Sequence, residues 1–545
     1  MGIVTVDGKE VPLAPGEKIN GIQAAERAGI DVPRYCWHAG LTVVASCRMC
    51  LVESGRVNDK TGKIEMQPKL VPACQTPATD GTIFVTNTDK VKNARAMVEE
   101  DLLIRHPIDC PICDKAGECS LQDYHFEHGR DQRRADIQPF TSRRREMGDT
   151  VTLFVDRCVM CTRCVRFTRE ISGTSELMVI NRGSHEEIDV FPGHPLANKM
   201  SGNVVDLCPV GALGDTDFLY SQRVWFMKSH DNVCANCSTG CSIKVEENQD
   251  RLYRLKPREN PFINQWWMCD EGRYGWKHVH DENRLTEPRL LKYGRHIPLE
   301  WHMIAEHLNS DLAKAGRLAA VLSPHLTVEE AYLLATYIRS LDADAIVAVG
   351  PIPVHGTDET FKNGFTIRAE KCPNRRGIEK IAAHFMDEQV VNWPSFLERL
   401  ASDNIRGVWL SGGYKHDWND AAAVEKFAGV KTLVVQDCFA SPLWDRANLQ
   451  LPAAAFPERD GSYVNYADRL QSFRWAVRPP AGVKTEAQLL WQLTGRVGLY
   501  NSRQVLEDVG REIGYFAAAA GGVSEYGVDL KVNLLAEQTV VQVTA

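Results

Sequence analysis

The sequence lacks the two apolar patterns that would direct a chain out of the cell or into a membrane. The opening residues, MGIVTVDGKEVPL, contain no basic stretch followed by an apolar run, so we expect no secretion. No stretch approaches the roughly 18 to 20 apolar residues of a membrane-spanning helix. Basic residues are not in excess either, since the formal net charge is −8 and the pI is about 6.1. These absences argue against a secreted, a membrane-spanning or a nucleic-acid-binding protein.

Cysteine, by contrast, is abundant and unevenly distributed. Of the 17 cysteines, only Cys372 and Cys438 follow Cys269. In a reducing compartment, clustered cysteines are more often metal ligands than disulfides, so disulfides are the less favoured alternative. A chain of 545 residues can form several domains. The distribution predicts a metal-bearing front half joined to a metal-free back half.

The first four cysteines have the spacing C-x10-C-x2-C-x23-C, which departs from the plant-type ferredoxin spacing. The residues before them predict four elements in order: a strand at Ile3–Val6, a turn at Asp7-Gly8, a return strand at Glu10–Leu13 and a helix at Gly21–Ala28. This order suits a small ferredoxin-like domain with a [2Fe–2S] cluster in its cysteine loop. The predicted ligands are Cys36, Cys47, Cys50 and Cys74.

The second set has the form H-x3-C-x2-C-x5-C. A lone histidine is usually a surface or core residue. Here three cysteines lack a fourth ligand, and His106 stands at a suitable spacing to supply it. A neutral imidazole in place of a thiolate lowers the negative charge of a cluster and raises its reduction potential. The predicted ligands of this [4Fe–4S] cluster are His106, Cys110, Cys113 and Cys119.

The third set is a C-x2-C-x2-C run closed by a Cys-Pro element after 43 intervening residues. No second run of this kind exists to exchange ligands, so one [4Fe–4S] cluster is the economical interpretation. Its predicted ligands are Cys158, Cys161, Cys164 and Cys208. Arg163, Arg166 and Arg169 recur at intervals of three beside it. They predict either positive charge next to the cluster or a solvated basic face.

The fourth set has three closely spaced cysteines and one that follows after 27 residues. A zinc ribbon normally offers two C-x2-C pairs, so this pattern favours a third [4Fe–4S] cluster over zinc, which remains the alternative. The predicted ligands are Cys234, Cys237, Cys241 and Cys269.

Longer stretches around these ligands resemble a known family. They are SCRMCLVE, HPIDCPICDKAGECSLQD, RCVMCTRCVRFTREISGT, NVVDLCPVGAL, CANCSTGCSIKV and WWMCDEGRYGW. Over residues 1 to about 280 the chain is similar to the large iron–sulfur subunit of bacterial respiratory complex I, the G-subunit family of NADH:quinone oxidoreductases. The resemblance implies that the first three clusters lie on the electron path from a flavin subunit towards quinone. It implies that the fourth cluster lies off that path.

The back half alternates apolar strands with helices. We expect strands at Leu318–Leu322, Ala345–Val349, Val408–Leu410 and Leu433–Val435, and helices at Val328–Leu341 and Asn419–Phe427. This alternation predicts a mostly parallel sheet covered by helices. Gly412-Gly413 follows a strand but is not a G-x-G-x-x-G phosphate loop, so a simple turn is favoured and no NAD site is expected.

The back half resembles a shortened molybdopterin-oxidoreductase domain, of the kind found in formate dehydrogenases. Active members of that family commonly carry a lysine two positions after the fourth cluster cysteine, where this chain has Glu271. Cys372 stands roughly where formate dehydrogenases carry a metal ligand, but only 276 residues follow Cys269, too few for the usual cofactor-enclosing lobes. We therefore expect no molybdopterin, and an ordinary partly buried side chain for Cys372.

The predicted fold class is α+β followed by α/β, in five domains. They are a [2Fe–2S] ferredoxin-like (β-grasp) domain at 1–85, a His/Cys3 [4Fe–4S] domain at 86–130, a ferredoxin-type [4Fe–4S] domain at 131–222, a [4Fe–4S] domain like the N-terminus of molybdopterin oxidoreductases at 223–285, and a degenerate molybdopterin-oxidoreductase-like α/β domain at 286–545.

The predicted function is electron transfer within complex I, without catalytic residues in this chain. The resemblance implies a flavin and NADH-binding partner, other peripheral-arm subunits, and a place on the cytoplasmic side of the membrane, reached only through partners. Two alternatives are a subunit of an NAD-linked formate dehydrogenase or hydrogenase, and an assembly scaffold with zinc or vestigial sites. Candidate docking features are Arg143–Arg145 and Trp266–Trp267, for which a solvated face and a core contact are the favoured interpretations.

Overall fold

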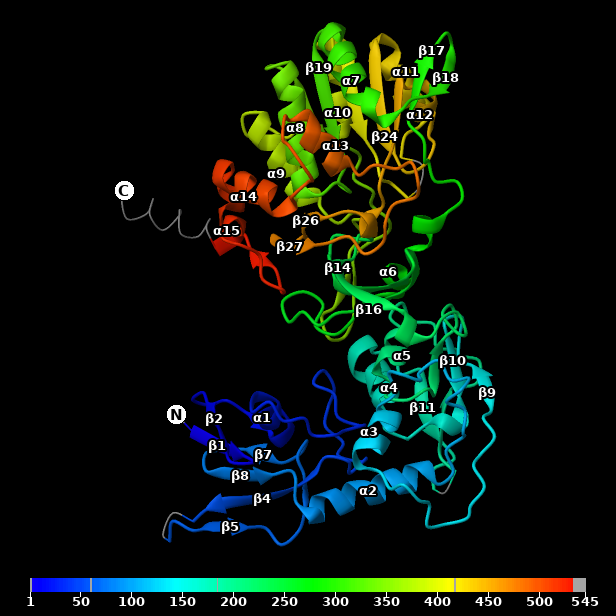
Figure 1. The fold of residues 1–545 in the computed structure, drawn as a ribbon, viewed down its shortest axis with the longest axis vertical. Helices are drawn as coiled ribbons and strands as arrows, with labels where there is room; N and C mark the ends of the chain where they lie inside the picture. Colours follow the sequence, from blue (N-terminus) through cyan, green and yellow to red (C-terminus); the bar gives the residue numbers. More distant parts are fainter. Residues whose placement is uncertain (1, 59–60, 184, 416–417, 533–545) are drawn as a thin grey trace. The chain divides into compact units, whose positions relative to one another are not determined.

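The computed structural model describes residues 2–58, 61–183, 185–415 and 418–532 (Figure 1). The chain divides into two compact units. Unit 1 comprises Met1–Met227 with Phe361–Gly364, and unit 2 comprises Lys228–Thr360 with Phe365–Ala545. The first three predicted ligand sets therefore lie in unit 1, and the fourth lies entirely in unit 2.

Unit 1 begins with a mixed sheet and one short helix. Its elements are β1 (Gly2–Val6), β2 (Lys9–Leu13), α1 (Gly21–Arg27), β4 (Leu51–Val57), β5 (Ile64–Met66), β6 (Val71–Pro72) and β8 (Thr82–Val85). The strand order is β2-β1-β8-β4-β5, with β6 paired to β4. Asp7 and Gly8 both have positive φ, 46° and 83°, and make the hairpin turn that the Asp-Gly pair predicts. Asn20 and Gln23 form a capping box at the start of α1.

The rest of unit 1 consists of short elements, several of which start or end at cysteines. They are α2 (Asp89–Leu103), α3 (Ser120–His128), β9 (Arg144–Glu146), β10 (Val151–Phe154), α4 (Arg163–Phe167), β11 (Leu177–Ile180), β12 (Glu187–Val190), α5 (Asn203–Leu207) and β13 (Leu213–Asp215). The strands form two antiparallel sheets, β13-β10-β9 and β11-β12. Cys119 directly precedes α3, and Cys208 directly follows α5.

Unit 2 begins with the antiparallel sheet β14 (Lys228–Val233), β15 (Ser242–Asn248) and β16 (Arg251–Pro257). Cys234, Cys237 and Cys241 lie in the loop between β14 and β15. Cys269 is the N-cap of α6 (Asp270–Tyr274). A second antiparallel sheet is formed by β26 (Gly461–Val464), β27 (Arg469–Phe473) and β28 (Val528–Asp529).

The largest sheet of the molecule organises the rest of unit 2. Its strands are β17 (Arg289–Lys292), β18 (Arg295–Pro298), β19 (Leu318–Leu322), β20 (Ile346–Val349), β23 (Gly407–Ser411), β24 (Thr432–Asp437) and β25 (Leu449–Pro452). The order is β18-β17-β25-β24-β23-β19-β20, and the five strands from β25 to β20 are parallel. The chain goes from β19 to β20 on one side and then returns to β23 on the other. The strand order therefore reverses between β19 and β23.

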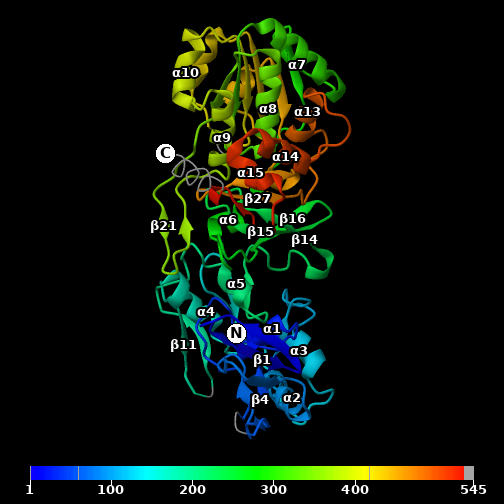
Figure 2. The ribbon, with the colours of Figure 1, turned by 90° about the vertical axis from the view of Figure 1, so that its left-hand side faces the viewer.

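Helices cover both faces of this sheet (Figure 2). They are α7 (Trp301–Ala315), α8 (Val328–Leu341), α9 (Arg375–Phe385), α10 (Trp393–Ser402), α11 (Ala421–Lys426), α12 (Pro442–Arg446), α13 (Glu486–Leu493), α14 (Ser502–Glu512) and α15 (Ala517–Ala520). Alternate residues of one strand face opposite layers: Ala320 packs with α7, α8, α9, α13 and α14, whereas Ala319 and Val321 pack with α10 and α12. Burial on both faces explains the uninterrupted apolar sequence of the strands.

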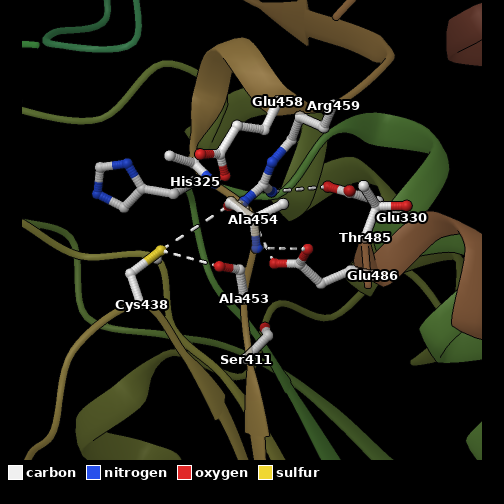
Figure 3. Close-up of polar contacts among 12 residues, drawn as sticks. His325, Glu330, Ser411, Cys438, Ala453, Ala454, Glu458, Arg459, Thr485 and Glu486 are labelled. Atoms are coloured by element: carbon white, nitrogen blue, oxygen red, sulfur yellow. Dashed lines mark hydrogen bonds and ion pairs between the residues drawn. The ribbon is translucent and has the colours of Figure 1, made fainter. Parts of the chain in front are cut away.

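Buried ion pairs connect the helices of unit 2 to its loops (Figure 3). Arg459 donates hydrogen bonds to Glu330 of α8 at 2.9 Å and to Glu486 of α13 at 3.2 Å, and all three side chains are at most 4% exposed. Nearby, the Cys438 thiol donates to the carbonyl oxygens of Ala453 and Ala454. Cys438 is therefore a buried structural cysteine.

The predicted elements are confirmed with shifts of a few residues. The predicted strand at 318–322 and helix at 328–341 have the bounds of β19 and α8. The predicted helix at 419–427 is shorter, because Asp420 accepts a hydrogen bond from the Ala423 amide and caps α11 there. In the described part of the chain, no helix combines the length and the hydropathy needed to cross a membrane.

Candidate metal centres

The first set of cysteines gathers in the loop that joins α1 to β4 and just after β6. Cys36, Cys50 and Cys74 are buried, and Cys47 is half-buried. The Cys36 side chain is hydrogen-bonded to those of Cys47 and Cys74, and Cys74 also to that of Cys50. These contacts lower the pKa of Cys36 and raise that of Cys74. These contacts link all four cysteines, whose sulfur atoms form a suitable donor set for an iron–sulfur cluster.

The second set is more open. Cys113 is buried, Cys119 is half-buried and Cys110 is exposed. Burial lowers the pKa of His106 to about 4, so its imidazole is neutral at pH 7, as a metal ligand must be. The charged groups that act on His106 are Arg157 and Asp109. A neutral imidazole is compatible with metal binding, but the assignment of His106 to the ligand set still depends on the sequence spacing.

The third set encloses a cavity. All four cysteines line it, together with apolar residues that include Leu153, Ile188 and Val210. The Met160 amide donates to Cys158 Sγ at 3.4 Å, and Met160 and Thr162 have positive φ, 48° and 59°. Left-handed backbone is unfavourable for such residues and gathers at functional sites. An apolar cavity between four sulfur atoms fits a [4Fe–4S] cluster.

Two arginines join the loops of the first and third sets. Arg166, only 2% exposed, donates to the carbonyl oxygens of Cys36, Thr42 and Cys161. Arg163 donates to the carbonyl oxygens of Trp37 at 2.6 Å and Leu207 at 3.2 Å. A solvated basic face is therefore the wrong interpretation for these two residues. Arg169 does have an exposed side chain.

The second and third sets are also in direct contact, through residues that the sequence-based predictions do not include. The Ser120 amide, next to Cys119, donates to the Pro209 carbonyl at 2.9 Å. A Cβ atom at Gly211 would lie 2.1 Å from Cys113 Sγ, so only glycine fits there. The glycine in the motif CPVGAL was the available signal for this close approach.

The fourth set is fully buried. A Cβ atom at Gly272 would lie 3.1 Å from Cys234 Sγ and 3.5 Å from Cys269 Sγ, which places these two sulfur atoms around one backbone position. The Gly272 amide donates to Cys269 Sγ at 3.3 Å. Burial raises the pKa of Cys234 to about 11, so its thiolate needs a positive partner such as a metal centre.

Among the described residues, no group of three or more His, Cys, Asp or Glu is arranged to hold a metal ion. An iron–sulfur cluster holds its ligands further apart than a single ion does, because several iron and sulfide atoms lie between them. The ligand sets therefore stay predictions, supported by the sulfur contacts and by the cavity of the third set.

A cavity of about 350 Å³ lies beside the fourth set, at the carboxyl ends of β19, β20 and β23. In parallel sheets, ligands bind at this edge where the strand order reverses. Its walls include Asn236 and Glu271 from the cysteine segments, and Lys371 and Lys415 from the α/β part. Cys372 is 0% exposed, which suits an ordinary buried cysteine.

The amides of the two glycines that follow β23 are already engaged, that of Gly412 by the Gln436 carbonyl at 2.7 Å. The Gly413 amide donates to the buried Asp437 carboxylate at 2.8 Å, and the Trp418 indole N–H donates to it at 2.7 Å. Burial raises the pKa of Asp437 to about 6. An internal carboxylate thus occupies the position where an anionic ligand group would bind, in agreement with the simple turn predicted here.

Arg143 and Arg144 have exposed side chains, in agreement with the solvated face expected for Arg143–Arg145, and their charges are paired. Arg143 pairs with Asp156 and Glu187, and Arg145 pairs with Glu187 and Asp189. Trp267 is 1% exposed and belongs to the core, as predicted.

Comparison with known proteins shows which families and relatives this chain is similar to. Three family models match unit 1: a 2Fe-2S iron-sulfur cluster binding domain over residues 3–89, the NADH-ubiquinone oxidoreductase-G iron-sulfur binding region over 95–134, and the ferredoxin-like domain of NADH-quinone oxidoreductase subunit 3 over 148–214. The G subunit of the Rickettsia felis NADH-quinone oxidoreductase is 33% identical over 345 residues, which cover 63% of this chain and 49% of that protein. Over this shared length the chain is similar to the G subunits of NADH-quinone oxidoreductases.

A mitochondrial relative matches over a larger part of the chain. The mitochondrial NADH dehydrogenase [ubiquinone] iron-sulfur protein 1 of Solanum tuberosum is 31% identical over 500 residues, covering 83% of the chain and 65% of that protein. The chain spans about half the length of the first curated relatives it matches. A solved NAD+-reducing [NiFe]-hydrogenase structure matches with 25% identity and a TM-score of 0.34, covering 41% of this chain and 91% of that one.

Two further family models match unit 2. They are the molybdopterin oxidoreductase Fe4S4 domain over residues 227–281 and molybdopterin oxidoreductase over 380–496. The chain thus contains 2Fe–2S and 4Fe–4S cluster-binding domains and a molybdopterin-oxidoreductase domain, as the predicted fold class states. The limits of the five predicted domains stay predictions.

Proposed function

We propose that this chain is an electron-transfer iron–sulfur subunit of an NADH:quinone oxidoreductase. It relays electrons, one at a time, from a flavin and NADH-binding partner towards a quinone-reducing module. The observation that carries the proposal is the continuity of the three ligand sets in unit 1. Arg166 joins the first set to the third, and Gly211 packs the third against Cys113 of the second.

The proposed cofactors are one [2Fe–2S] and three [4Fe–4S] clusters, held by the four predicted ligand sets. The clusters supply the redox chemistry, and the protein positions them and sets their potentials. Its residues exclude water around the third and fourth sets by burial, and donate amide hydrogen bonds to Cys158 and Cys269. No residue of this chain needs to act as acid, base or nucleophile.

We further propose that unit 2 holds no molybdopterin. Two observations support this. The Glu271 carboxylate, paired with Lys371 at 2.7 Å, stands on the cavity wall where active relatives commonly carry a lysine. The Asp437 carboxylate already accepts the amide hydrogen bond of Gly413 at the end of β23. The partners are the flavin subunit and other peripheral-arm subunits, and the site of action is the cytoplasmic side of the membrane.

Elemental mass spectrometry of the anaerobically purified chain tests this proposal. We expect about 14 irons per chain, the sum for one [2Fe–2S] and three [4Fe–4S] clusters, and no molybdenum. Cys158→Ala should remove about four irons. Cys372→Ala, at another buried cysteine, is the matched control and should remove none. Near-stoichiometric molybdenum that is lost in Cys372→Ala would refute the proposal and support a subunit of the formate dehydrogenase type.

A further inference from the structure

A lysine from the α/β part of unit 2 reaches the segments that carry the fourth set. Lys415, in the loop after β23, donates from Nζ to Asn236 Oδ1 at 2.9 Å and to the Gly275 carbonyl at 3.1 Å. Asn236 lies between Cys234 and Cys237. Gly275 closes the short helix α6, which begins at Cys269. Both acceptors therefore belong to the two cysteine-bearing segments.

The charge of this lysine acts directly on the fourth set. Burial lowers the pKa of Lys415, whereas Cys234, Glu271, Cys237 and Cys269 favour its charged form. In return, Lys415 opposes the rise that burial causes in the pKa of Cys234. In the part of the chain that the structure describes, Lys415 makes no ion pair. The carboxylate that acts on it is that of Glu271, which is itself paired with Lys371.

Two further charged residues on the cavity wall beside the fourth set, Glu271 and Lys371, pair with each other. Glu271 stands two residues after Cys269, and its carboxylate is 2.7 Å from Lys371 Nζ. The cavity wall next to the cysteines thus carries two lysines and one glutamate. Of these two lysines, Lys371 pairs with the glutamate, whereas Lys415 binds the cysteine-bearing segments and comes from a loop far from Cys269 in sequence.

We propose that the Lys415 ammonium raises the reduction potential of the fourth cluster. This inference rests on the proposed function, because it takes the fourth set as cluster ligands. Reduction adds one electron to the cluster, without any proton or bond change, and makes it one charge more negative. A fixed cation in a low-dielectric surrounding stabilises the reduced form more than the oxidised form. Lys415 thereby supplies, from a distant loop, the cation that is missing at position 271.

A redox titration of the full chain, followed by electron paramagnetic resonance, tests the proposal. Cys269→Ala removes the fourth cluster and so identifies its signal. In Lys415→Gln we expect the reduction equilibrium of that signal to weaken about tenfold, a shift of about 59 mV to lower potential for a one-electron couple. The potentials of the other three clusters should not change. Lys415→Arg keeps the charge and should retain most of the wild-type potential.

Two further variants separate charge from folding. Glu271→Gln removes the opposing charge and should shift the same signal upwards. Lys484→Gln is the matched control, because Lys484 is another half-buried lysine of unit 2, in contact with Trp301 and Gln492. It should leave all potentials unchanged.

Three results would overturn the inference, and they are distinguishable from one another. An intact fourth signal with an unchanged potential in Lys415→Gln would exclude the role of this lysine alone. If Lys415→Gln loses the fourth cluster, Glu271→Gln becomes the deciding variant. An unchanged potential of the fourth signal in Glu271→Gln would then exclude the proposed role of Lys415. If the wild type shows no signal that depends on Cys269, the fourth ligand set of the proposed function fails as well.

Discussion

At the scale of single residues, His106 is the predicted ligand whose chemistry differs from that of all the others. Its side chain is half-buried and neutral at pH 7, because burial lowers its pKa to about 4. In the predicted cluster the three cysteines would bind as thiolates, so one neutral ligand would leave that centre less negative than an all-cysteine centre. The ligand set thus predicts that the reduction potential of this cluster depends on the identity of the side chain at position 106.

Replacing His106 with cysteine should preserve the cluster and lower its potential, because a thiolate adds one negative charge. A redox titration followed by electron paramagnetic resonance measures the shift. His128→Cys, on α3 of the same unit, is the control and should leave the potential unchanged. Retention of the cluster at the wild-type potential in His106→Cys would remove His106 from the ligand set.

At the scale of elements, ion pairs hold the helices of unit 2 to the loop after β25. Arg459 links α8 to α13 through two buried carboxylates, and Arg284 makes a bidentate pair with Glu458 at 2.8 and 2.9 Å. Burial raises the pKa of Glu486 to about 7, which shows how strongly this surrounding disfavours an unpaired carboxylate. A cation at Arg459 is therefore required once both carboxylates are ionised.

Arg459→Met should destabilise unit 2 by about 3–5 kcal/mol, the cost of breaking a buried pair by removing one partner. The urea midpoint of unfolding, measured by tryptophan fluorescence, reports the change. Arg503→Met is the control, because the pair of Arg503 with Glu507 at 3.0 Å is largely exposed. Exposed pairs contribute about 0–1 kcal/mol. Equal midpoints for the two variants would contradict a stabilising role of the buried network.

At the scale of the whole molecule, every ligand set falls within one unit. The first three sets lie before Met227, and the fourth lies after Lys228. Each unit also has its own buried core, such as the cluster around Val4, Val6 and Ile22 in unit 1. Metal binding in one unit should therefore not require the ligands of the other.

Separate fragments test this independence. A fragment of residues 1–227, which omits only Phe361–Gly364 of unit 1, should hold about 10 irons, and a fragment of residues 228–545 should hold about four. Iron analysis after anaerobic purification gives both values. Loss of the fourth cluster from the second fragment alone would show that its ligands need unit 1 to assemble.

The sequence by itself determined most of the regular elements and the predicted ligand sets. Cluster ligands recur at short spacings, because one loop must supply several sulfur atoms to one small centre, as in the run from Cys158 to Cys164. The strands of the large sheet were evident because burial on both faces demands continuous apolar runs, as at Leu318–Leu322. The capping interactions that set the ends of helices are harder to recognise in the sequence. The helix expected at 419–427 therefore begins two residues later.

Only the tertiary structure decided which distant residues surround the centres. Arg166 reaches the Cys36 carbonyl across 130 positions. Lys415 reaches Asn236 across 179 positions. No periodic pattern in the sequence predicts such contacts. They depend on how whole elements pack and on which loops meet at the same edge of the sheet. The sequence therefore identifies the predicted cluster ligands, whereas the packing decides which charges surround them.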